Sequence, residues 1–356
     1  MRVFEIGSEY DWGSNKEFEK MEDNNAIFNS GFDNVKFLRS GRDALRYIAK
    51  ALKKEKKTVL MPALSCSCMP EPFEDENYEI VYYKLTTDFK VIVEDVLRKL
   101  KPDSIFLFMN YFAIPALNKS DLEKIAKSQN NVITVEDITH DFLKRGLETC
   151  NADITVCSIR KWFAIPDGGM LFSKIELPKI TVEQDAFFAN KRISAMKRKS
   201  VYLSNGKTEE KEIFRTELSE ANQYIDAAKN VSAMSHQSVD VLRNINLSSM
   251  YKTRLRHCRN LFDKLSGLDN IRLMGNESLE STLYFPILVE NQNIIQRKLA
   301  ERGVYAPVIW PLPKKAEGVC EVADDASNHM LGIPCDHRYM DEEILKVALI
   351  IEEVVK

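Results

Sequence analysis

The sequence has no long apolar run and no strong excess of charge of one sign. Its longest apolar stretches, such as residues 347–351, are far shorter than the roughly 20 residues that a membrane-spanning helix needs. Residues 1–11 contain no apolar stretch long enough for a signal peptide. The net charge of −3 provides no strong field that would attract nucleic acid or an anionic membrane. We therefore expect a cytoplasmic protein that binds neither nucleic acid nor membranes.

Cysteines are few and scattered. The seven of them lie at positions 66, 68, 150, 157, 258, 320 and 335. An odd, dispersed set is not typical of a disulfide framework. Cys66 and Cys68 form the only close pair, and no further Cys or His lies nearby to complete a zinc site. We interpret the cysteines as ordinary buried thiols and expect no metal.

The composition and the order of apolar segments are typical of a soluble α/β protein. Apolar residues make up 44% and charged residues 29% of the 356 positions, enough for one large or two moderate domains. In the first half, short apolar segments alternate with helical patterns, which predicts a mostly parallel sheet covered by helices on both faces. The expected strands are 57–61, 79–84, 104–110, 132–136, 153–158 and 169–173, the last one antiparallel, and the expected helices are 43–53, 91–100 and 119–128.

The second half has a different character. Residues 180–262 are polar and helical in pattern, and include basic residues at 191, 192 and 197–199. We interpret this basic run as a solvated helix face, and the alternative is an anion contact for a substrate diphosphate. After about residue 265 an α+β pattern follows, with strands 281–288 and 306–310 and helices 294–302 and 341–355. We predict an N-terminal arm and large domain over residues 1–235 and a smaller α+β domain over 236–356.

Side chains that could carry chemistry follow the predicted strands. Ligands of open α/β sheets bind at the carboxyl ends of the strands, so these side chains should share one edge. They are Asp137, His140, Ser158 and Lys161, with Ser40-Gly41-Arg42 ahead of the first helix. Chemistry on pyridoxal phosphate needs such a set: a lysine amine for the Schiff base, a carboxylate at the pyridine nitrogen, and a helix N-terminus for the phosphate.

The order and spacing of these residues resemble the DegT/StrS-type sugar aminotransferases, which are fold-type-I pyridoxal-phosphate enzymes. Lys161 precedes the pair Gly168-Gly169 by seven residues, which is the family's spacing for the Schiff-base lysine. The resemblance implies an aspartate aminotransferase-like fold, with a large cofactor-binding domain and a small C-terminal one. It also implies that Asp137 pairs with the pyridine nitrogen and that His140 packs near the cofactor ring.

The resemblance assigns further residues to the cofactor pyridoxal 5'-phosphate. The turn Ser40-Gly41-Arg42 would hold the phosphate, helped by Ser158, although the family usually places that serine at the position of Val156. Cys66 matches the place of an aromatic residue that stacks on the ring. Asn230 matches, one position off, an asparagine that reaches the phosphate of the neighbouring subunit.

The implied activity is transfer of an amino group from glutamate to a keto group of a nucleotide-linked sugar, in cell-surface or secondary-metabolite sugar biosynthesis. The resemblance also implies a homodimer. Three alternatives stay open: a keto substrate other than a sugar, a sugar dehydratase, and a non-catalytic binding or regulatory protein. Retention of Lys161 argues against the dehydratase, in which the lysine is replaced. Tyr305 and Trp310 fit either a substrate cleft or ordinary packing of aromatic residues.

Overall fold

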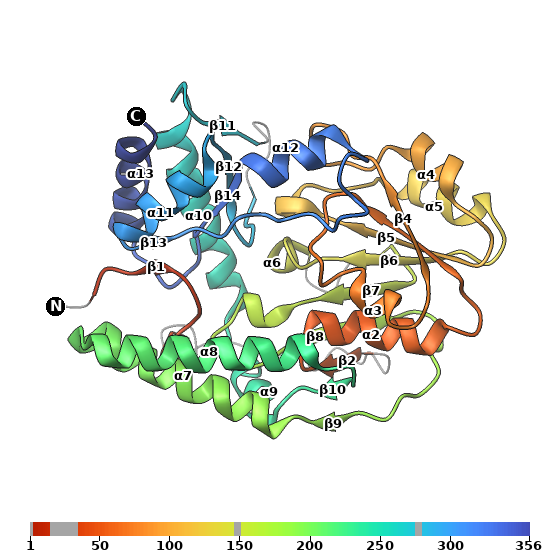
Figure 1. Ribbon diagram of the computed structural model, residues 1–356, viewed down its shortest axis with the longest axis horizontal. Coiled ribbons are helices and arrows are strands. Elements are labelled where there is room, and N and C mark those ends of the chain that lie inside the picture. The colour runs from red at the N-terminus through yellow and green to blue at the C-terminus, as the bar shows by residue number, and fades with distance from the viewer. Residues whose placement is uncertain (1–2, 15–34, 146–150, 275–279) are drawn as a thin grey trace.

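A nine-stranded mixed sheet fills the centre of the molecule (Figure 1). The computed structural model describes residues 3–14, 35–145, 151–274 and 280–356. Cys150 and the other residues between these ranges lie outside the described residues. The strand order is β4-β3-β5-β6-β7-β8-β2-β10-β9. The bounds are β2 Val35–Leu38, β3 Thr58–Pro62, β4 Glu79–Tyr83, β5 Ser104–Met109, β6 Ile133–Asp137, β7 Ile154–Cys157, β8 Gly169–Ser173, β9 Glu183–Gln184 and β10 Ser232–Ala233.

The pairing confirms the predicted mostly parallel core of this sheet. Strands β3 to β7 pair in parallel, and β8 runs antiparallel between β7 and β2. Strands β3, β5, β7 and β8 are buried along their whole length, as expected for strands covered on both faces. The connecting helices are α2 Gly41–Leu52, α3 Glu71–Glu74, α4 Val93–Lys99, α5 Lys119–Ser128 and α6 Phe142–Arg145, with short 3₁₀ turns η1 Tyr111–Ala113 and η2 Ile159–Lys161.

Helix α2 brings its N-terminus to the strand edge where the predicted site lies. Ser40 caps the helix, because its side-chain oxygen accepts a hydrogen bond from the backbone N–H of Asp43 at 3.1 Å. Arg39 then binds Asp43 at 2.8 Å and Asp185 at 2.5 Å, and its side chain is only 1% exposed. The loop that leads into α2 is therefore held in place by buried ion pairs.

Two long helices run side by side along one edge of the molecule (Figure 1). They are α7 Ala186–Asn205 and α8 Thr208–Ala227, and they are followed by α9 His236–Leu242 and α10 Leu247–Leu265. The interpretation of the basic run as a solvated face is wrong for Arg192 and Lys199, whose side chains are 2% exposed. These two residues lie seven apart, about two helical turns, and so share the inward face of α7.

The C-terminal elements gather at one end of the molecule around a second apolar core (Figure 1). They are β11 Arg272–Leu273, β12 Phe285–Leu288, α11 Gln292–Glu301, β13 Val304–Tyr305, β14 Met330–Ile333 and α13 Asp341–Val355. Helix α12 Glu321–His329 lies nearer the middle and contributes Ala323 and Ala326 to the core of the large sheet. The prediction of a strand over 306–310 is wrong. The strand ends at Tyr305, and only Val308 forms an isolated bridge, to Leu331. Pro307 has no N–H to donate to a ladder, which explains the interruption.

The N-terminal segment, residues 3–14, crosses between these parts. Strand β1 Ile6–Gly7 pairs in parallel with β13. The backbone N–H of Val3 donates to Leu203 of α7, and that of Trp12 donates to Met196. We call residues 3–14 the strap, because they tie the C-terminal elements to the long helices. Among the described residues, no helix is long and apolar enough to cross a membrane.

Candidate active site

Lys161 ends the short turn η2, which follows directly after strand β7. Its backbone N–H donates to Ser158 at 3.2 Å, so the turn fixes the origin of the side chain. Burial lowers the pKa of the Lys161 amine, and the neighbouring positive charge of Arg160 lowers it further. Within the described residues the amine makes no hydrogen bond or ion pair, so it is free to act as a nucleophile or base.

Both glycines of the pair after Lys161 are closely packed, Gly169 against the backbone at the start of α2 and Gly168 against the lysine turn itself. A Cβ at Gly169 would lie 2.0 Å from the carbonyl oxygen of Ser40, and one at Gly168 would lie 3.2 Å from the backbone nitrogen of Arg160. Gly41 is also packed tightly, because a Cβ there would lie 2.9 Å from Cβ of Ser158. The lack of a side chain at Gly169 and Gly41 permits the close approach that places the N-terminus of α2 beside the Lys161 turn.

Asp137 ends strand β6, and Thr139 holds it in place. The backbone N–H of Thr139 donates to Asp137 Oδ1 at 2.8 Å. The Thr139 hydroxyl accepts from the backbone N–H of Ser158 at 3.0 Å, linking the ends of β6 and β7. Burial raises the pKa of Asp137, while the hydrogen bonds from Thr139 and the charge of Lys161 act in the opposite direction. Asp137 is thus a positioned carboxyl group next to the lysine.

An inner cavity of about 330 Å³ lies at this edge of the sheet. Most of the predicted cofactor residues line it together, from four different elements and loops. These residues are Ser40, Gly41, Arg42, Cys66, Asp137, Ser158 and Lys161. Val156 and Thr139 line the cavity too. The predicted meeting of α2, β6 and β7 at one site is therefore what the fold produces.

Two predicted residues do not line this cavity. His140 is fully buried, and its ring packs 5.0 Å from Phe112 and 5.4 Å from Trp310, centroid to centroid. Trp310 lines the cavity in its place. Burial, followed by the charge of Lys161, lowers the pKa of His140 well below its usual value, so its imidazole is neutral. Asn230 is exposed and bonds Ser232, and its contact with a neighbouring subunit stays a prediction.

Cys66 and Cys68 depart from the expectation of ordinary buried thiols. They form a disulfide, with their Cα atoms 5.3 Å apart, and both line the inner cavity. That separation lies inside the range that a disulfide can bridge, and the loop after β3 turns tightly enough to provide it. The remaining cysteines of the described residues are free and buried: Cys157, Cys258, Cys320 and Cys335.

A larger outer cavity of about 610 Å³ adjoins the inner one. Lys161, Arg160 and Glu9 line both, so these residues mark the junction. Tyr305 lines the outer cavity, as one reading of the sequence expects, together with Arg215, Arg254, Arg297 and Arg338. The Lys161 amine can thus be approached from two sides.

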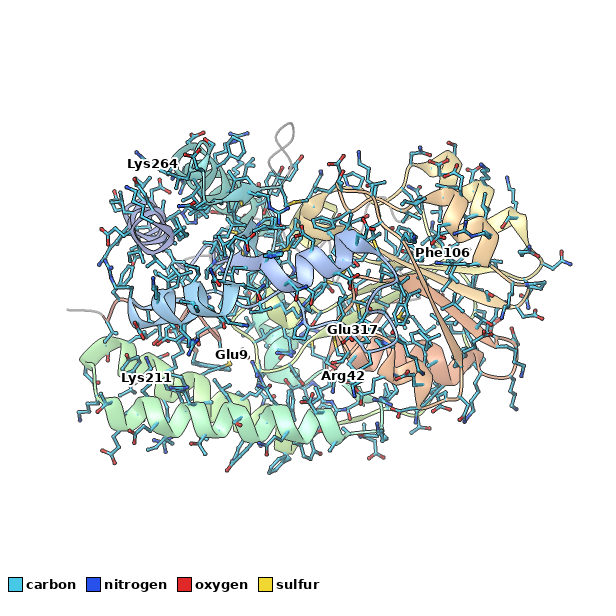
Figure 2. All side chains as sticks on the ribbon, turned by 45° about the horizontal axis from the view of Figure 1, so that its top comes forward. Glu9, Arg42, Phe106, Lys211, Lys264 and Glu317 are labelled. Atoms are coloured by element: carbon cyan, nitrogen blue, oxygen red, sulfur yellow. A yellow bond between two sulfur atoms is a disulfide. The ribbon has the colours of Figure 1, made fainter. Side chains whose placement is uncertain are left out.

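Glu9 is a site residue that the sequence analysis missed. Figure 2 shows it between the α7–α8 pair and the C-terminal elements. Its carboxylate binds Arg192 at 2.6 Å, and its carbonyl accepts from Lys199 at 2.6 Å and from Arg338 at 3.2 Å. Burial opposes its ionisation, but the guanidiniums of Arg192 and Arg160 outweigh burial and lower the pKa of Glu9 to about 2. The sequence signal that could have pointed to a buried acidic partner was the spacing of Arg192 and Lys199, which places both on one face of their helix.

No protein-family model matches the chain, and no curated protein matches it in sequence. Solved structures do match it. Helicobacter pylori PseC, an aminotransferase involved in the biosynthesis of pseudoaminic acid, is similar at a TM-score of 0.65 and 12% identity, over 99% of this chain and 98% of that one. A DegT/DnrJ/EryC1/StrS aminotransferase from Brucella abortus is similar at a TM-score of 0.61 and 15% identity, over 91% and 86%.

A third structure is Spr1654 from Streptococcus pneumoniae in its PLP form, with a TM-score of 0.64 and 13% identity over 99% of this chain and 92% of that one. At such identities the likeness establishes the fold. The predicted α/β fold, with a large helix-covered mixed sheet and smaller C-terminal elements, is confirmed as that of the sugar aminotransferase structures.

Proposed function

We propose that this chain is a pyridoxal-phosphate-dependent aminotransferase of the DegT/StrS type, in which Lys161 carries the cofactor. The observation that supports it most is the inner cavity. There a lysine amine that has no partner among the described residues, a positioned carboxyl group and a helix N-terminus face one space. The fold shared with aminotransferase structures supports the same proposal.

The residues present fit the cofactor. Gly41 lets the N-terminus of α2 approach Ser158, so backbone N–H groups and the Ser158 hydroxyl can hold a phosphate together. Asp137 supplies a carboxylate for the pyridine nitrogen, and Lys161 supplies the amine. When bound, pyridoxal phosphate supplies a carbonyl carbon for covalent attachment and a ring that takes up electrons.

The chain's own residues then perform the proton transfers. The lowered pKa of Lys161 raises the fraction of its amine that is neutral, so that Nζ could accept a proton from the amino donor and release it again. Thr139 holds Asp137 in place through its N–H bond. Trp310 and the Cys66–Cys68 loop form part of the cavity wall.

The finer assignment follows the resemblance. We propose glutamate as the amino donor and a keto group of a nucleotide-linked sugar as the acceptor, in a cytoplasmic homodimer of a sugar-biosynthesis pathway. The outer cavity supports an acceptor larger than the cofactor, because it extends from Lys161 to the exposed residues Arg215 and Arg297. PseC, with the same fold, is an aminotransferase involved in the biosynthesis of pseudoaminic acid.

The experiment that tests the proposal is an absorbance titration. The protein is loaded with pyridoxal phosphate, and the visible band of lysine-bound cofactor is followed before and after addition of glutamate. Borohydride reduction followed by peptide mapping should locate the adduct on Lys161. Lys161→Ala should show no reducible adduct, and Lys144→Ala, which removes a half-buried lysine paired with Glu280 outside the cavity, should behave like the wild type.

The outcomes separate the alternatives. A band that glutamate bleaches establishes the first half of a transamination, and keto acceptors can then be compared by return of the band. A wild type that stays colourless at saturating cofactor would contradict the enzyme proposal and leave a fold retained for binding. A band that no amino acid bleaches would contradict amino transfer while retaining the cofactor.

A further inference from the structure

Arg160 stands at the junction of the two cavities, immediately before Lys161. Its backbone N–H donates to Gly168 at 3.0 Å, so the same turn that positions the lysine positions the arginine. Both side chains line both cavities. Any group that bonds to Lys161 or to a cofactor on it must therefore pass close to the Arg160 guanidinium.

In the part of the chain that the structure describes, the Arg160 guanidinium has no anionic partner of its own. Its Nε atom is buried without a hydrogen-bond partner, and no carboxylate of the described residues lies within ion-pair distance of it. An unpaired polar atom in such a place costs free energy that a hydrogen-bonding ligand can recover. Arg160 is close enough to Glu9 to lower the pKa of the Glu9 carboxyl group. That carboxylate is, however, bound by Arg192 at 2.6 Å.

Building on the function proposed above, we propose that Arg160 is the specificity-determining residue that binds the carboxylate of the amino donor. In an α-amino acid the carboxylate is attached to the same carbon as the reacting amine. A cation that recognises it must therefore lie within a few ångströms of the lysine, and Arg160, adjacent to Lys161, meets that requirement. A guanidinium also binds a carboxylate through two parallel hydrogen bonds.

The location favours a carboxylate over a phosphate. In a nucleotide-linked sugar the diphosphate is separated from the keto carbon by several bonds, so its contacts belong farther from Lys161, where Arg215 and Arg297 are exposed in the outer cavity. A carboxylate on the reacting carbon therefore fits the position of Arg160 better than a diphosphate several bonds away does.

Loss of the Glu9 charge should affect anion binding in the opposite direction to loss of the Arg160 charge. Because its negative charge lies beside Arg160, it weakens the attraction of any anion for that guanidinium. The strap holds Glu9 there through its carbonyl, which accepts from Lys199 and Arg338, and these backbone bonds survive a change of the side chain. Removing the charge of Glu9 should strengthen anion binding, whereas removing the charge of Arg160 should weaken it.

The test is calorimetric titration of glutarate, a donor analogue without an amine, into cofactor-loaded protein. We expect Arg160→Gln to weaken glutarate binding about 10-fold to 100-fold, the range for a charge-assisted hydrogen-bonded pair. Arg160→Lys should recover part of the loss, and Glu9→Gln should tighten binding. Arg302→Gln removes an exposed arginine that pairs with Glu353 and lines neither cavity, and serves as the charge-matched control. Melting temperatures establish that each variant is folded.

The result separates failure of this inference from failure of the proposed function. An Arg160→Gln variant that keeps the cofactor band but binds glutarate as tightly as the wild type overturns the inference alone. So does a variant that loses affinity for pyrophosphate while its affinity for glutarate is unchanged, because Arg160 would then serve a phosphate. If the wild type forms no cofactor band, the proposed function fails. In that case loss of glutarate binding by Arg160→Gln in the cofactor-free protein still supports a carboxylate site.

Discussion

Substitution of Gly169 by alanine should damage the phosphate cradle, by which we mean the N–H groups at the start of α2 and the Ser158 hydroxyl. The substitution removes none of these groups. The added Cβ would lie 2.0 Å from the carbonyl oxygen of Ser40, 2.2 Å from its carbonyl carbon and 2.7 Å from the backbone nitrogen of Gly41. Since favourable contacts need about 3.5 Å, the backbone at the start of α2 must move by roughly 1.5 Å. All three of the atoms it meets belong to the backbone, so no side-chain rotation can relieve the contact.

The expected magnitude follows from what that movement disturbs. Overpacking of this kind costs about 1–3 kcal/mol of unfolding free energy. The N–H groups at the start of α2 would also leave the 2.7–3.2 Å range of a good hydrogen bond to a phosphate oxygen. Losing one or two charge-assisted bonds of about 1.5 kcal/mol each weakens cofactor binding roughly 10-fold to 100-fold.

Cofactor dissociation constants of Gly169→Ala and wild type, measured by fluorescence titration, test this reasoning. Gly13→Ala is the matched control, because its nearest neighbour, a carboxylate oxygen of Asp11, would lie at an ordinary 3.6 Å. The control should keep both cofactor affinity and melting temperature. If Gly169→Ala binds the cofactor as tightly as the wild type and melts at the same temperature, the cradle is not where we place it.

Three further predictions follow from the site. Asp137→Asn should keep cofactor binding but slow amino transfer about 10²–10³-fold, measured as the rate of band loss with glutamate, because electrostatic support is lost; an unchanged rate would refute the role of Asp137. Glu9 is ionised in the fold with a pKa of about 2 against an ordinary 4.5, so its contribution to stability is complete above pH 4.5 and is lost as the pH falls towards 2. Glu9→Gln should flatten acid unfolding in that window, and a variant with the wild-type acid profile would contradict the shift. Maleimide counting in denaturant should find two more thiols after reduction, and none more in a Cys66→Ser/Cys68→Ser variant; equal counts in the wild type would exclude the disulfide.

The large domain was predictable because its strands are short, apolar and separated by amphipathic helices. The strands predicted at 57–61 and 169–173 correspond closely to β3 and β8. The helix predicted over 341–355 matches α13, with its acidic first turn. Lys161, Asp137 and Ser158 could be brought together from the sequence because parallel strands end at one edge.

Other features depended on contacts between distant residues. The disulfide between Cys66 and Cys68 requires a particular loop shape that composition does not specify. The 306–310 segment has the apolar residues of a strand, but Pro307 interrupts the hydrogen bonding. Only one isolated bridge forms there among the described residues. His140 follows its strand as expected, yet Trp310, from a loop 170 residues later in the chain, takes the position facing the cavity.

The strap explains why the basic face of α7 that carries Arg192 and Lys199 is buried. Lys199 binds Glu5 at 3.0 Å and the carbonyl of Glu9 at 2.6 Å, while Tyr10 donates to the carbonyl of Trp162, next to Lys161. One segment therefore contacts α7, the C-terminal elements and the lysine turn. Because its charges are compensated by α7, a carboxylate can be held beside Arg160 without being paired to it. That arrangement leaves the Arg160 guanidinium available to bind an anion. The net charge at the junction of the cavities therefore depends on the strap, which carries Glu9, as well as on the sheet edge, which carries Arg160.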